Sequence, residues 1–95
     1  MISLCTILLD ISLPGVRSLK EKRSIVKPII LKMRRKFNIS VAEVEYQDIW
    51  NRSLLLCAIA SNNNRFSQQQ AMKIMDFFEN EFKTVILLSH KIEFL

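Results

Sequence analysis

The side chains best suited to chemistry in this sequence are the cations of residues 17–36. That segment holds nine of the fourteen Lys and Arg residues and a single acid, Glu21, so its formal charge is +8 in a chain of net charge +5. Cations at this density favour a nucleic-acid partner, because each one that meets a phosphate displaces condensed counterions. The candidate phosphate-binding residues are Arg17, Lys20, Arg23, Lys27, Lys32, Arg34 and Arg35.

The spacing of these cations indicates a linear footprint on a helix. Four of them recur at i, i+3, i+7 and i+14, namely Lys20, Arg23, Lys27 and Arg34. Like charges one turn apart destabilise a helix by about 0.2–0.5 kcal/mol per pair, and no acid on this helix is placed to offset them. An anionic partner such as a nucleic-acid backbone would offset them. Two alternatives stay open: a plain solvated face, whose last cations stabilise the helix macrodipole, and a surface for an acidic protein.

Other candidate chemistry is sparse. His90 has no second ligand nearby in sequence and is interpreted as structural. Cys5 and Cys57 lack C-x-x-C spacing and are interpreted as reduced core thiols. The turn at residues 14–17 is too poor in glycine to wrap a phosphate closely, as an acylphosphatase-like enzyme would require. We therefore expect no catalytic residue, no metal and no cofactor.

A second candidate contact for nucleic acid is the aromatic stretch of residues 46–52. Tyr46 and Trp50 lie close to Arg52, and such rings can stack on unpaired bases. Aromatic side chains more often close one end of a core or form part of a dimer contact, and that interpretation is preferred.

Hydrophobic periodicity predicts the elements that position these residues. Alternation predicts strands at Ser3–Leu13, Asn38–Glu45, Ser53–Ser61 and Thr84–Phe94.

Two helices are predicted between these strands. Ser18 with Glu21 forms a capping box that begins the first helix, and Ser67 with Gln70 forms one for the second. Pro28 falls inside the first helix, where it costs about 3 kcal/mol, so a kink or a break is expected there.

The order β, α, β, β, α, β predicts an α+β, ferredoxin-like sandwich. Its four-stranded antiparallel sheet carries two helices on one face, and residues 1–95 form a single domain. The third strand has no aromatic residue, so this sheet is not the RNA-binding platform of an RRM.

The first and third strands are apolar on both faces, which predicts that the uncovered sheet face meets another surface. A homodimer is the simplest partner, and the alternative is cover by the segment after the second strand or by the C-terminus. The candidate self-association residues are Ile2, Leu4, Leu8, Leu54 and Leu56.

Several motifs resemble those of one family of small bacterial proteins. R-S-L-K-E-K-R at Arg17–Arg23 follows L-P-G, N-I-S-V-A-E-V stands at Asn38–Val44, and A-x-A-S-N stands at Ala58–Asn62, with Asp48, Trp50 and Arg52 between the last two. Together they resemble the YlxP-like family, and the match spans nearly the whole chain. The resemblance implies a ferredoxin-like fold and a setting in ribosome assembly or translation, because the family's genes often neighbour that of ribosome-binding factor A. It implies no catalytic activity. Pro28 departs from the pattern and puts the straightness of the basic helix in doubt.

We therefore expect a non-enzymatic accessory protein of the cytoplasm, without a membrane span, that binds ribosomal RNA or a ribosomal subunit through its first helix. The alternative is a homo-oligomeric protein-interaction or ligand-sensing domain, whose basic stripe meets the acids Asp76, Glu79 and Glu81 of another molecule.

Overall fold

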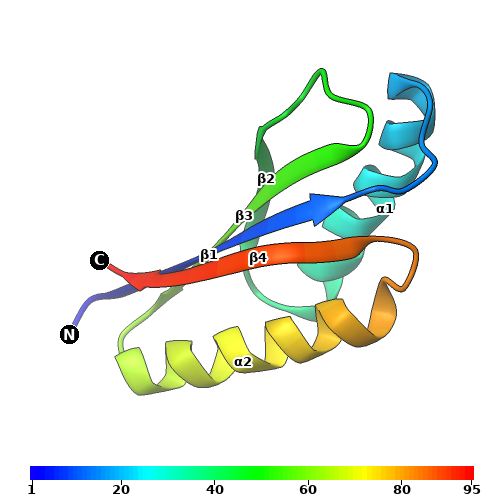
Figure 1. Cartoon of the computed structure of the whole chain (residues 1–95). Coiled ribbons are helices and arrows are strands. Elements are labelled where there is room, and N and C mark those ends of the chain that lie inside the picture. The colour runs from blue at the N-terminus through cyan, green and yellow to red at the C-terminus, as the bar shows by residue number, and fades with distance from the viewer.

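A single antiparallel sheet of four strands organises the molecule. The computed structural model describes all residues, 1–95, and its strand order is β2-β3-β1-β4, with the two helices packed on one face (Figure 1). This arrangement confirms the predicted ferredoxin-like fold. The elements are β1 (Ser3–Ser12), α1 (Leu19–Lys36), β2 (Ser40–Glu45), β3 (Arg52–Ser61), α2 (Asn64–Glu81) and β4 (Ile86–Phe94).

The core lies between the sheet and the helices, and the strand pleat builds it. Alternate residues of β1 point to the helices and are fully buried, as Ile7 and Leu9 are. Their neighbours on β3 share this orientation, and one of them, Cys57, pairs directly with Ile7. Both cysteines are free and buried, as predicted. The core is therefore one apolar layer, and the alternation of apolar residues along β1 and β3 predicts its members.

The two helices cover different strands of the sheet. α2 begins near the chain termini and runs beneath β1, β3 and β4, whereas α1 packs against β2 and stands beside the loop that joins β2 and β3 (Figure 1). The molecule is elongated as a result, with principal-axis extents of 45 × 23 × 21 Å. No helix combines the length and the apolar character that crossing a membrane requires.

Helix α1 begins as predicted but forms only half of the capping box. The Ser18 hydroxyl accepts the backbone N–H of Glu21 at 3.0 Å. The Glu21 carboxylate accepts the N–H of Arg17, at 3.3 Å, in place of that of Ser18. The helix continues through Pro28, whose ring is exposed, so of the two expected alternatives, a kink and a break, the break does not occur.

The predicted start of the second helix is wrong by one turn. α2 begins at Asn64, because the Asn63 side chain accepts the N–H groups of Arg65 and Phe66 and serves as the N-cap. Ser67 is fully buried inside the helix, where its hydroxyl bonds those of Ser3 and Ser61. Ser67 therefore joins α2 to the sheet and does not cap it.

The last strand changes face partway along. The pairing of β1 with β4 shifts register between Asp10 and Ile11, so Leu87 lies opposite Ile11 on the helix side. Ile86 lies opposite Ser12 on the other face and is exposed. A single apolar parity from Ile86 to Phe94 was expected, and the irregularity divides it.

Candidate nucleic-acid interface

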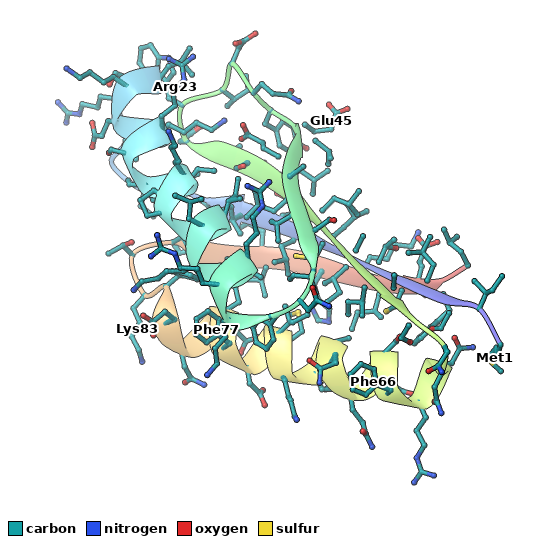
Figure 2. All side chains as sticks on the ribbon, turned by 180° about the vertical axis from the view of Figure 1, so that it is seen from behind. Met1, Arg23, Glu45, Phe66, Phe77 and Lys83 are labelled. Atoms are coloured by element: carbon teal, nitrogen blue, oxygen red, sulfur yellow. The ribbon has the colours of Figure 1, made fainter.

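The predicted phosphate-binding cations all lie on or just before α1 and are all exposed. Figure 2 shows Arg23 projecting from the N-terminal half of the helix, near the loop between β2 and β3. The buried face of α1 consists instead of Lys22, Val26, Ile29 and Met33. The helix therefore presents its charge outward, as the spacing predicted.

Two of these cations have partners inside the protein. Lys32 forms an ion pair of 2.7 Å with Glu81 of α2, and its hydrogen bond lowers the pKa of that carboxyl group. Arg34 donates to the backbone carbonyl of Val41 at 2.6 Å, so it holds α1 against strand β2. The other five have no ion pair or side-chain hydrogen bond within the protein, and we call them the α1 cation row: Arg17, Lys20, Arg23, Lys27 and Arg35.

Lys22 is a buried member of the same segment that the sequence reasoning missed. Only 2% of its side chain is exposed, and its ammonium lies 2.9 Å from the Glu43 carboxylate on β2. It also donates to the backbone carbonyls of Tyr46 and Gln47, while Glu43 accepts from the Ser53 hydroxyl. A signal existed, because Lys22 falls three residues after Leu19 and four before Val26 on the apolar stripe.

The β2–β3 loop is fixed to α1 by these bonds. Tyr46 adopts a left-handed backbone conformation, with φ of 64°, and its carbonyl accepts a hydrogen bond from the Lys22 ammonium. The Arg52 guanidinium covers the Tyr46 ring at 4.9 Å and binds Asp10 through two nitrogens. Trp50 is 51% exposed, so it closes no core within the monomer. One face of Tyr46 is thus occupied, whereas Trp50 is available to a partner.

A cleft of about 450 Å³ opens between α1 and β2. Its walls combine aliphatic side chains with cations of the α1 cation row. The aliphatic lining is Val26, Ile30, Leu31 and Ala42, and the polar lining is Lys22, Arg23, Lys27, Arg34, Glu43 and Gln47. The sequence did not predict this cleft, since it depends on how α1 stands against the sheet edge.

The uncovered sheet face carries the predicted self-association leucines. Leu8 of β1 lies directly opposite Leu56 of β3, and both are half-buried, as are Leu4 and Leu54. Ile2 precedes β1 and is 90% exposed. The ion pair Arg52–Asp10 joins the two strands that carry these leucines, and the pair Lys91–Glu93 lies on the neighbouring strand β4.

The fold and the surface of α1 define the chain as a ferredoxin-like α+β domain with a cationic helix. Residues 4–91 match the family described as protein of unknown function (DUF503), and the chain belongs to that family. It is also 33% identical, over 63 residues, to the "Uncharacterized protein YlxP" of Bacillus subtilis (strain 168), in an alignment that covers 66% of this chain and 68% of that protein. These matches confirm the resemblance to the YlxP-like family.

Proposed function

We propose that this protein is a non-enzymatic, cytoplasmic accessory factor that binds ribosomal RNA or a ribosomal subunit through α1. The observation that carries the proposal is the α1 cation row, whose five members have no carboxylate partner in the molecule. Unpaired cations along one exposed helix suit a phosphate backbone, which presents negative charge at regular intervals.

The pairing of Lys32 favours this proposal over an acidic protein partner. The competing interpretation requires the acids of α2 to meet the basic stripe of another molecule. Glu81, one of those acids, already bonds Lys32 of its own chain at 2.7 Å. Contact between the acids of one molecule and the cations of another would therefore lack Glu81 and Lys32, while the α1 cation row keeps its charge.

We further propose that the uncovered sheet face binds a second copy of the chain. Its leucines form an apolar centre, and the ion pairs Arg52–Asp10 and Lys91–Glu93 beside them are formed within the chain, so these four side chains bring no unpaired charge to the contact. Because the helices lie on the opposite face of the sheet, such a dimer presents α1 on both outer sides (Figure 1).

Ribosome co-sedimentation at increasing salt tests the RNA proposal. Arg23→Glu with Lys27→Glu reverses two members of the α1 cation row, and we expect binding to fall and its salt dependence to weaken by about one unit of slope for each phosphate that is no longer bound. Lys73→Glu with Lys83→Glu, two exposed lysines at and after α2, changes the net charge equally and should leave binding intact. Unchanged binding of the folded Arg23/Lys27 variant would rule out the proposal.

A further inference from the structure

The cleft between α1 and β2 has the dimensions of a ligand site. Its volume of about 450 Å³ lies within the range of about 300–1,000 Å³ typical of small-molecule pockets. It lies directly beside the α1 cation row, because Arg23 and Lys27 line it. A ligand in this cleft would therefore touch the surface that we propose binds RNA.

The lining of the cleft pairs an apolar floor with a positive rim. Ile30 is half-buried and Leu31 is exposed, and together they offer an aliphatic surface above the buried Val26. Ala42 meets the cleft through its backbone, because its side chain shares the uncovered sheet face with Leu56. Arg23 and Lys27 stand above the aliphatic surface without protein carboxylates. Glu43, the single acid of the lining, is already neutralised by Lys22. The cleft thus suits a molecule with an apolar, planar part and an anionic part.

The Gln47 amide at one end of the cleft is suited to hydrogen bonding with the edge of a ligand. The Gln47 backbone is held in place because its carbonyl accepts from Lys22 at 3.4 Å. The Gln47 side chain is exposed and has no hydrogen-bond partner in the protein, so its amide can both donate and accept. Positioned amides of this kind bond the edges of unpaired bases.

The edge strand β2 argues against a peptide as the occupant. A peptide that lies between a helix and an edge strand normally adds a strand to the sheet through backbone hydrogen bonds. Here the Val41 carbonyl of that edge already accepts from Arg34 at 2.6 Å. Strand addition would have to break this bond, whereas a nucleotide needs no bond from the edge.

We propose that this cleft binds one unpaired nucleotide of an RNA strand, with the base on the aliphatic floor and the phosphate at Arg23 and Lys27. This inference rests on the proposed function and specifies its ligand as single-stranded RNA. The Arg23 guanidinium can stack on the outer face of the base, as arginine does in other RNA complexes. The Gln47 amide then faces the edge of the base.

The test compares single-stranded and double-stranded RNA on a variant whose cleft is filled. Leu31→Trp places an indole at an exposed position of the lining on α1 and leaves every charge in place. We expect the affinity for oligouridine and oligoadenine to fall about tenfold, in line with the contribution of one stacked base, while the affinity for duplex RNA is unchanged. Gln68→Trp on the exposed face of α2 is the matched control and should bind both as the wild type does.

A second readout is backbone amide NMR of the protein during titration with a mononucleotide or with its sugar phosphate alone. Nucleoside 5′-monophosphates should shift the signals of Leu31, Ala42 and Gln47, whereas ribose 5-phosphate should shift only those near Arg23 and Lys27. Gln47→Ala, at an exposed loop position, should weaken binding of single strands about threefold, so the inference stays testable if Leu31→Trp does not fold.

The outcomes separate this inference from the proposed function. If RNA binds in a salt-dependent way and Leu31→Trp lowers no single-strand affinity, the cleft proposal is wrong and the proposed function stands. If an acidic peptide shifts the signals of the cleft and no mononucleotide does, the occupant is a peptide and the cleft proposal is likewise wrong. If wild-type protein binds no RNA, the proposed function fails, and the mononucleotide titration still decides whether the cleft holds a nucleotide.

Discussion

The ammonium of Lys22 lies 2.9 Å from the carboxylate of Glu43, and this pair joins α1 to β2 behind the α1 cation row. The same ammonium fixes the β2–β3 loop through two carbonyls. Lys22 therefore fastens α1 to β2 and to the β2–β3 loop. The position of the exposed cations beside the cleft depends on these bonds.

Lys22→Met should lower the free energy of unfolding by about 3 kcal/mol, because it leaves the Glu43 carboxylate partly buried and without its cation. Lys20→Met, an exposed neighbour, should change it by less than about 0.5 kcal/mol. Urea unfolding of both variants measures the difference. Equal effects of the two substitutions would show that the pair with Glu43 does not stabilise the fold.

Pro28→Ala should raise the free energy of unfolding by about 1–3 kcal/mol. Pro28 lies in the helix interior, where proline removes a backbone donor, and its ring is exposed, so the substitution forfeits no core packing. Thermal unfolding checks this expectation, with Lys27→Ala as a control on the same exposed surface. A stability below that of the wild type would indicate that the helix depends on the shape proline imposes.

Burial raises the pKa of the Cys57 thiol to about 12, which predicts a loss of stability in alkali. The folded chain keeps this proton, whereas the unfolded chain releases it near pH 8.5. The stabilising effect is therefore complete below about pH 8.5 and declines as pH rises toward 12, by at most about 1.4 kcal/mol per pH unit. Cys57→Ala should show a shallower alkaline decline in unfolding experiments, and parallel curves for the two proteins would contradict this assignment.

Leu8→Lys with Leu56→Glu should convert the proposed dimer to a monomer. These residues lie directly opposite each other, so the new charges can pair within one sheet, yet burying them against a second copy is unfavourable. Sedimentation equilibrium measures the change. Met72→Lys, at an exposed apolar position on α2, should leave the oligomeric state unaltered. A wild-type protein that is monomeric at all concentrations would remove the basis of this prediction.

The fold was predictable because β1 and β3, the two central strands, alternate with one face in the core. The alternation of buried residues such as Ile7 and Leu9 is visible within β1 alone. The cap that begins α1 is also local, because Ser18 bonds Glu21 only three residues later. The start of α2 was missed because two polar residues compete for the role of cap. Only the structure shows that Ser67 instead bonds the hydroxyl groups of Ser3 and Ser61.

The candidate site was predictable in its charge and not in its shape. The spacing of Lys20, Arg23 and Lys27 located the exposed row, since helical periodicity is local. The partners of Lys22 and Arg34 are more distant in the chain or on another element, at Glu43 and Val41. Lys22 and Arg34 stand in the same basic segment as the α1 cation row, so the sequence did not distinguish cations that have a partner in the protein from cations that have none.

The bond from Arg34 to Val41 also makes the two borders of the sheet unequal. A guanidinium occupies one carbonyl of the border formed by β2, whereas no side chain bonds the backbone of β4 at the other border. Backbone pairing between two molecules would therefore be less hindered through β4 than through β2, and pairing of β4 with β4 would end with two molecules.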